Sequence, residues 1–243
     1  MTRLRTILLA GAVLAAAALA ASPASAATTR CVPGSFSQSR GGPLVVAEQG
    51  MILTGGRRFI SDIVAQQRVS ACSFRNGRVT SFGISQSLQC GPGCDDPDFR
   101  SPALRSIGAI AVNGPYFAYA VDNCPAQPPS GPTPCSRRIR VGSLRTGRLV
   151  HELDPGPGGV ARLVLASRRG DFAYITRVGT GPTAPYEVRK VTRTGTQVLD
   201  AGADVEAGSL AIVHSPDVTP EGSSFDAQYV YWRRGGVAKS DAL

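Results

Sequence analysis

The sequence predicts an all-β protein built from about four repeated, four-stranded units. The strand at 116–121 alternates aromatic with small residues, and it recurs at 171–176 and more loosely at 228–232. Such residues suit a buried sheet strand. The tyrosines that align these copies lie 55 and 57 residues apart in the chain: Tyr119, Tyr174 and Tyr231. No segment longer than about ten residues has helical periodicity with caps.

The first 26 residues have the pattern of an export signal. Arg3 and Arg5 form a charged region, 7–21 is apolar, and 24–26 supplies a small-residue cleavage site. The apolar run is short for a membrane span, which favours a cleaved signal over an uncleaved anchor. We therefore expect a secreted, extracytoplasmic chain that begins near Ala27, with no membrane insertion after the signal is removed.

Without that segment the chain has 24 basic and 17 acidic residues, a net charge of +7. Only Lys190 and Lys239 are lysines, and we interpret the arginine bias as genome composition, so no nucleic-acid partner is expected. A protein of this charge outside the cytoplasm is expected to contact anionic wall polymers weakly at physiological salt. We expect it to be a monomer.

Six cysteines remain after export, an even number in an oxidising compartment, so disulfides are expected. Six cysteines allow 15 pairings. Proximity in the sequence favours Cys90 with Cys94 and Cys124 with Cys135, and elimination then leaves Cys31 with Cys72.

An extended, glycine-rich arm at 27–42 precedes a single β domain at 43–243. Gly55-Gly56 and Asn76-Gly77 are expected to turn hairpins, and Asn-Gly is the strongest such signal. The strands are expected at 43–48, 51–53, 58–64, 68–74, 78–84, 106–112, 116–121, 138–144, 148–153, 161–166, 172–177, 186–192, 197–200, 209–213, 228–232 and 237–242.

These strands sort into four consecutive units. Ser61 in the first unit is expected to occupy the position that Tyr119, 58 residues further along the chain, has in the second unit. The last unit lacks its fourth strand, and the leading strand at 43–48 has no unit of its own. If that strand completes the last unit, a ring closes and two exposed sheet edges disappear. We therefore predict a small β-propeller-like ring, closed by the N-terminal strand.

Three features carry a resemblance: the aromatic strands, the Arg-Thr-Gly turns at 145–147 and 193–195, and the aromatic and glycine pairs within 231–236. On these, 43–243 resembles exported bacterial β-propeller-like repeat proteins of unassigned function. The alternative is a β-sandwich or barrel whose strands are similar by chance.

In a propeller blade, the connections after the second and fourth strands emerge on one face. We assign to this face the connections at 85–105, 122–137, 154–159, 178–185, 201–207 and 214–227, which together contain ten acids and three bases. Insertions gathered on one side of a repeat protein usually mark its binding side, although acids also favour turns. Binding is expected at Asp95, Asp96, Asp98, Asp122, His214, Asp217, Glu221 and Asp226.

These observations predict an exported, non-catalytic binding or scaffold protein. Its acidic face, whose loops are closed by disulfides, is expected to bind a protein, peptide or glycan partner. The alternative is a cell-envelope hydrolase or lyase that uses the acids of this face with His214, although no nucleophile motif accompanies that histidine.

No metal or cofactor is expected. The acids at 95–98 lack the spacing of a calcium loop. The letters of a dinucleotide fingerprint occur at 156–161, but a strand follows them instead of a helix. Trp232 is expected to pack between units.

Overall fold

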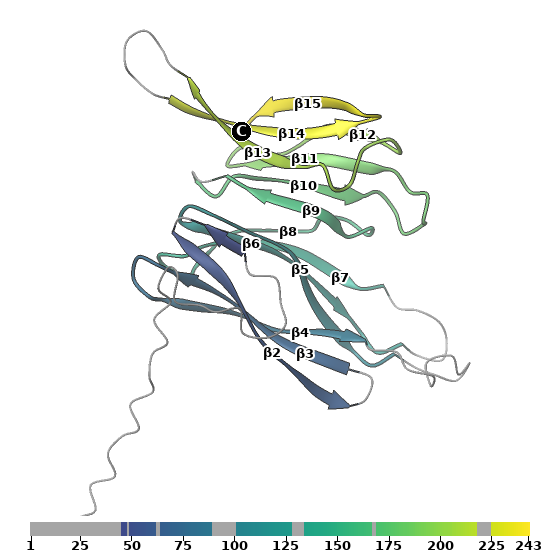
Figure 1. Ribbon diagram of the computed structural model, residues 1–243. Coiled ribbons are helices and arrows are strands. Elements are labelled where there is room, and N and C mark those ends of the chain that lie inside the picture. The colour runs from purple at the N-terminus through teal and green to yellow at the C-terminus, as the bar shows by residue number, and fades with distance from the viewer. Residues whose placement is uncertain are drawn as a thin grey trace, which may run out of the picture.

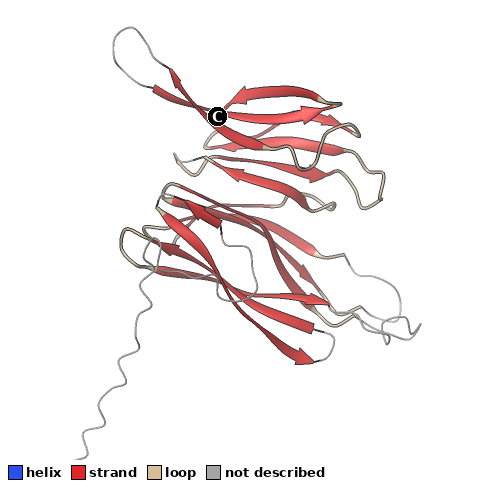
Figure 2. Ribbon diagram, in the orientation of Figure 1, coloured by secondary structure: helices blue, strands red, loops and turns tan. Residues whose placement is uncertain are grey.

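The computed structural model describes residues 45–47, 49–61, 64–88, 101–127, 134–166, 169–217 and 225–243. These residues form fifteen strands in four antiparallel sheets, and no helix occurs among them (Figures 1 and 2). The predicted all-β class is thus confirmed. The expected signal at 1–26 and the arm at 27–42 lie outside the described residues.

Strands within each sheet follow the order of the chain. The first sheet contains β1 (Val45–Ala47), β2 (Gly50–Ser61), β3 (Val64–Ser73) and β4 (Val79–Leu88). The second contains β5 (Leu104–Asn113), β6 (Tyr116–Cys124), β7 (Ser136–Ser143) and β8 (Leu149–Leu153). The third contains β9 (Val160–Leu165), β10 (Phe172–Arg177), β11 (Tyr186–Thr192) and β12 (Gly195–Gly202). The fourth contains β13 (Ala211–Asp217), β14 (Phe225–Arg234) and β15 (Val237–Ala242).

The four sheets stack in chain order (Figure 1). The first strand of each sheet contacts the first strand of the next, so that β1, β5, β9 and β13 follow one another through the stack. The second and third sheets match the predicted units closely, because each has an aromatic second strand bounded by clear turns.

The first sheet differs from the prediction in two ways. Gly55-Gly56 does not turn a hairpin: β2 continues through it, with a register shift between Thr54 and Arg57. The N-terminal strand also does not complete the last unit, because Val46 in β1 pairs with Met51 in β2. That pairing uses the strand within the first sheet and leaves the fourth sheet with three strands among the described residues.

The second strand of each later sheet packs against the sheet before it. In β6, Phe117 and Tyr119 face the first sheet, where Phe82 stacks on Tyr119 with ring centroids 4.2 Å apart. In β10, Phe172 and Tyr174 are fully buried against the second sheet. Burial of one such side chain stabilises the fold by about 1.5–3 kcal/mol.

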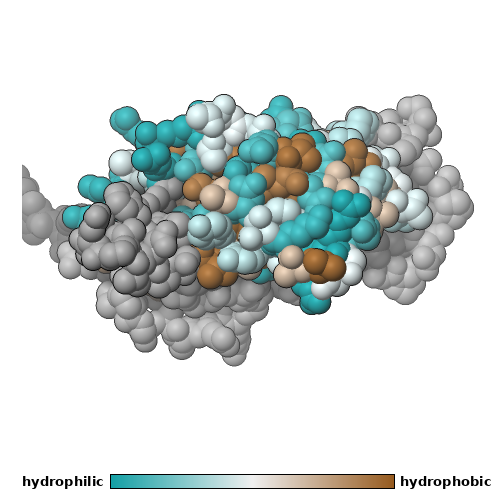
Figure 3. Space-filling view, turned by 90° about the horizontal axis from the view of Figure 1, so that it is seen from above, coloured by the Kyte–Doolittle hydropathy of each residue, from teal (hydrophilic) through white to brown (hydrophobic). Residues whose placement is uncertain are grey.

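In the fourth sheet this pattern is displaced by one residue. Val230 and Trp232 are the side chains of β14 that face the third sheet, and Trp232 packs between sheets as predicted. Trp232 therefore takes the position of Tyr174, in place of the predicted Tyr231. Tyr229 and Tyr231 project from the outer face, where apolar and polar side chains are mixed (Figure 3). An antiparallel sheet can face water on one side.

A substitution at Gly142 in β7 tests the packing of the second sheet. This glycine pairs with Phe117, and a Cβ atom at Gly142 would lie 2.3 Å from Cζ of that ring. Gly142→Ala is expected to lower the free energy of unfolding by about 1–3 kcal/mol, because the buried ring must shift. Denaturant unfolding with the disulfides intact measures this change.

Gly181→Ala is the matched control, because nothing lies within 4 Å of its Cβ position. This variant is expected to change stability by less than about 1 kcal/mol, in the stabilising direction. Wild-type stability in Gly142→Ala would contradict the packing of Phe117.

Candidate functional site

The connections emerge at two opposite ends of the sheets, because neighbouring strands are antiparallel. We call the end with the β4–β5, β6–β7, β8–β9, β10–β11 and β12–β13 connections the loop end, on the right in Figure 1. The other end, on the left, holds the β3–β4, β5–β6, β7–β8, β9–β10 and β11–β12 turns, and we call it the turn end.

The predicted binding residues do not share one end. Asp122 lies in β6 at the loop end, whereas β13 and β14, which contain His214, Asp217 and Asp226, are joined at the turn end (Figure 1). The assignment of the connection at 214–227 to the common face is wrong, because it joins the first and second strands of its sheet. The backbone of Asp122 and the β13–β14 connection thus lie at opposite ends of the sheets.

The remaining predicted residues lie outside the described residues: Asp95, Asp96, Asp98 and Glu221.

Four acids of the predicted loop face, all at the loop end, are paired with arginines. The shortest distances are 3.4 Å for Asp122 and Arg137, 2.6 Å for Asp154 and Arg138, 2.9 Å for Asp204 and Arg234, and 3.8 Å for Glu206 and Arg233. The Gly156 N–H group and the Arg138 guanidinium hold the pKa of Asp154 below its usual value. These four acids thus leave little unpaired negative charge at the loop end.

A disulfide closes the β6–β7 connection as predicted. Cys124 and Cys135 are bonded, with their Cα atoms 4.1 Å apart. Cys72 is also disulfide-bonded. Cys31, Cys90 and Cys94 lie outside the described residues.

A pocket of about 530 Å³ adjoins this disulfide between the first and second sheets. Arg105 lines this pocket, and its guanidinium group donates a hydrogen bond to the Phe82 carbonyl at 2.9 Å. The backbone N–H of Arg105 donates to the Gln86 side chain at 3.0 Å. The pocket is lined by Gln86, Ala103, Leu104, Arg105, Asn123, Cys124, Pro125, Pro134 and Ser136.

A second, more polar pocket of about 310 Å³ lies at the loop end between the second and third sheets. It is lined by Asp122, Arg137, Gly158, Gly159, Val160, Ala161, Arg177 and Tyr186, and we call it the Arg137–Arg177 pocket. Two cross-strand pairs supply its side chains. Asp122 pairs with Arg137 across β6 and β7, and Arg177 pairs with Tyr186 at the equivalent place in the third sheet. Such neighbours lie within contact distance.

The glycine-rich β8–β9 connection forms one wall of this pocket. A Cβ atom on Gly158 would lie 2.1 Å from the Arg177 carbonyl oxygen, and Gly159 has a φ of 77°. Thr176 Oγ1 lies 3.0 Å from the Pro155 carbonyl and 2.8 Å from that of Gly159. The glycines of the segment at 156–161, which resembles a dinucleotide fingerprint, therefore allow close backbone packing. Strand β9 follows this segment as predicted.

Two arginines line this pocket and contact its other walls. Arg177 donates to the Tyr186 hydroxyl at 2.8 Å, and its Cζ atom lies 5.2 Å from that ring's centroid. The Nε atom of Arg177 is buried and has no hydrogen-bond partner. Arg137 contacts Asp122 and also donates to the Pro157 carbonyl. With two guanidinium groups and one carboxylate, the pocket has a net positive charge that attracts anions.

The lining combines two guanidinium groups, one carboxylate and one phenol with four glycine or apolar residues. None of the eight lining residues is a serine, cysteine or histidine, the usual nucleophiles and bases. Across the described ranges, no group of three or more histidine, cysteine or acidic side chains is arranged to hold a metal ion.

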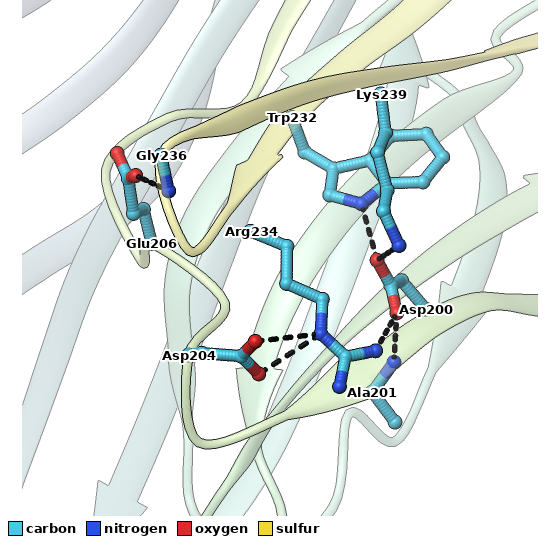
Figure 4. Close-up of polar contacts among 8 residues, drawn as sticks. All are labelled: Asp200, Ala201, Asp204, Glu206, Trp232, Arg234, Gly236 and Lys239. Carbon is cyan, nitrogen blue, oxygen red and sulfur yellow. Dashed lines mark hydrogen bonds and ion pairs between the residues drawn. The ribbon is translucent and has the colours of Figure 1, made fainter.

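Asp200 in β12 forms a separate charged cluster between the third and fourth sheets (Figure 4). It accepts hydrogen bonds from Trp232 at 2.8 Å, Lys239 at 3.0 Å and Arg234 at 2.8 Å. Burial opposes ionisation, but these bonds outweigh it and lower the pKa of Asp200 to about 2. The carboxylate side chain is only 7% exposed, so we interpret this cluster as a structural link between sheets.

Comparison with known proteins leaves the family open, since no protein-family model and no curated protein matches the chain. The described segments include no helix that is long and apolar enough to cross a membrane.

The Asp200 link predicts a pH-dependent stability. Its folded pKa of about 2 lies below the ordinary value of 3.8. The ionised group therefore stabilises the fold above about pH 4, by about 2 kcal/mol, and this contribution is lost as the pH falls toward 2. Asp200→Asn is expected to unfold more easily at pH 7 and to converge with the wild type near pH 2, as measured by urea unfolding.

Asp241→Asn is the control, because Asp241 pairs with Lys190 at a more exposed position. Its effect is expected to stay below about 1 kcal/mol. A deficit in Asp200→Asn that stays constant from pH 7 to pH 2 would show that its charge is not the cause.

Proposed function

We propose that this protein is an exported, non-catalytic binding protein. Its ligand is the acidic group of a protein, peptide or glycan partner, bound in the Arg137–Arg177 pocket. The observation that carries this proposal is the buried Nε atom of Arg177, which lacks a hydrogen-bond partner beside a second guanidinium group.

An unpaired buried donor has an energetic cost that a bound anion can remove. Leaving such a group unsatisfied costs about 1–3 kcal/mol, and more for a charged group. A carboxylate accepts two parallel N–H bonds from one guanidinium, and these charge-assisted bonds are stronger than neutral ones. The Tyr186 hydroxyl and the Asp122 carboxylate offer further polar contacts to hydroxyl or amide groups beside the anion.

Export is supported by the disulfides at Cys124–Cys135 and Cys72, which form in oxidising compartments. The charged and apolar pattern of residues 1–26 agrees with that compartment.

We also propose that the four sheets are blade-like units in a propeller-like stack. The contacts between successive first strands support this proposal, because those strands lie innermost in a propeller.

Arg177→Gln tests the proposed anion site. D-glucuronate is the probe, because it carries a carboxylate and several hydroxyl groups. We expect the wild type to bind glucuronate more tightly than glucose, and the variant to bind it at least about tenfold more weakly, since a charged hydrogen bond contributes about 1.5–3 kcal/mol. Titration followed by NMR measures both affinities.

Arg138→Gln is the matched control. Arg138 is the sequence neighbour of Arg137, but it pairs with Asp154 and does not line the pocket. Glucuronate affinity should persist in this variant. Equal affinities for glucose and glucuronate, or full affinity in Arg177→Gln, would refute the anion site.

A further inference from the structure

The turn end carries a group of exposed arginines that the pocket does not use. Two lie in the β3–β4 turn, two in the β7–β8 turn, and one each in the β9–β10 and β11–β12 turns. We call them the turn-end arginines: Arg75, Arg78, Arg145, Arg148, Arg169 and Arg193.

A repeated motif produces four of them. The segments at 73–78 and 143–148 share the pattern Ser, apolar residue, Arg, Asn or Thr, Gly, Arg. Both have the same backbone bonds, from the Ser N–H to the last Arg carbonyl at 2.9 Å and from the Gly N–H to the Ser carbonyl at 2.9 Å and 2.7 Å. The glycines have φ values of 67° and 69°, which favour glycine. Each turn therefore holds its two arginines in the same geometry.

These turns lie side by side across the stack. Asn76 donates to the Arg145 carbonyl at 3.3 Å, and the Arg78 guanidinium lies against Gly147. The β9–β10 turn adjoins the second sheet, because a Cβ atom on Gly170 would lie 3.2 Å from the Tyr116 ring. We call the exposed arginines of these successive turns in the first three sheets the row, of which the β3–β4 and β7–β8 turns are in direct contact.

None of the turn-end arginines forms an ion pair with another described residue. Such ion pairs involve eight other cations: Arg137, Arg138, Arg140, Arg189, Arg233, Arg234, Lys190 and Lys239. In the first three sheets the half-buried Asp171 is the described acid nearest to these turns in sequence. Asp217 and Asp226 also lie toward this end, but in the fourth sheet. The row therefore has a strong positive charge.

We propose that the turn-end arginines bind a linear polymer that carries phosphate or carboxylate groups. Packed sheets are spaced about 10 Å apart, so successive turns present guanidinium groups at intervals that an extended polyanion can follow. The planar fork of arginine matches either anion.

The apolar residue of each repeated motif favours a polymer over a lipid bilayer. Leu144 is buried, and Phe74 packs against Met51 and Cys72. Neither therefore projects as an anchor into a bilayer interface.

The experiment compares two variants of equal net charge. The turn variant carries Arg75→Gln, Arg78→Gln, Arg145→Gln and Arg148→Gln. The control variant carries Arg68→Gln, Arg138→Gln, Arg162→Gln and Arg233→Gln, at surface positions away from these turns. Polyphosphate and polygalacturonate are the polymer probes, and vesicles of anionic phospholipid are the third arm. Affinity is measured against NaCl concentration, and thermal melting confirms that each variant is folded.

We expect the wild type to bind at least one of the two polymers, with an affinity that falls steeply with salt. Each arginine that contacts the polymer adds about 0.7 to the slope of log K against log [NaCl], so the turn variant should lose up to about 3 in slope. The control variant should keep most of the slope. Arg177→Gln should bind polymer as the wild type does, which separates this surface from the pocket.

Three results would overturn the proposal. Equal losses in the two four-residue variants would mean that net charge alone governs binding. If the wild type binds neither polymer, linear polyanions are not the partner of this surface. Tighter binding to vesicles than to both polymers would assign the surface to membranes instead.

Discussion

The second strand of each sheet after the first buries alternate side chains against the sheet before it, and the stack depends on this contact. Phe117, Tyr174 and Trp232 are the large residues that make it in the second, third and fourth sheets. Side chains alternate along a strand, so a shift of one residue exchanges the buried and exposed faces. In β14 this places Trp232 inward, where Asp200 then holds it by a hydrogen bond.

The antiparallel order of the strands decides which residues meet at each end. Connections after even-numbered strands in the first three sheets emerge at the loop end, and those after odd-numbered strands emerge at the turn end (Figure 1). The loop end pairs its described acids with arginines and retains a pocket with an excess of guanidinium groups. The turn end repeats a short motif with two arginines and no acid. The two ends therefore differ in how their guanidinium groups are arranged, and we propose that each binds a different kind of anion.

The sequence predicted the second and third sheets because local signals agree there. In the first sheet, the predicted alignment of Ser61 with Tyr119 is wrong. Met51 and Phe117 each pair with the residue directly before a repeated turn, at 73–78 and 143–148, so these two residues are equivalent although 66 positions apart. The repeated turn motif was visible in the sequence and would have given this alignment. The bulge in β2 was not visible, because Gly-Gly is typical both of a hairpin turn and of an irregular strand.

The candidate site was predicted only through Asp122. Arg137, Arg177 and Tyr186 come together through pairing across strands and stacking between sheets, and an arginine-rich chain offers no local signal that selects two of its arginines. One positional signal existed: each cross-strand pair flanks the long connection after a second strand. The connection at 214–227 is as long as those of the loop end, but it joins the first and second strands of its sheet and therefore emerges at the turn end.

We propose that the two ends of the sheets bind different anions. Backbone amide shifts, mapped by NMR during separate titrations with glucuronate and with a linear polyanion, test it most directly. Glucuronate is predicted to shift the amides of Gly159 and Arg177 at the loop end, and the polyanion those of Gly77 and Gly147 at the turn end. Shifts from both ligands at the same end, or spread evenly over the sheets, would show that the two ends do not bind different anions.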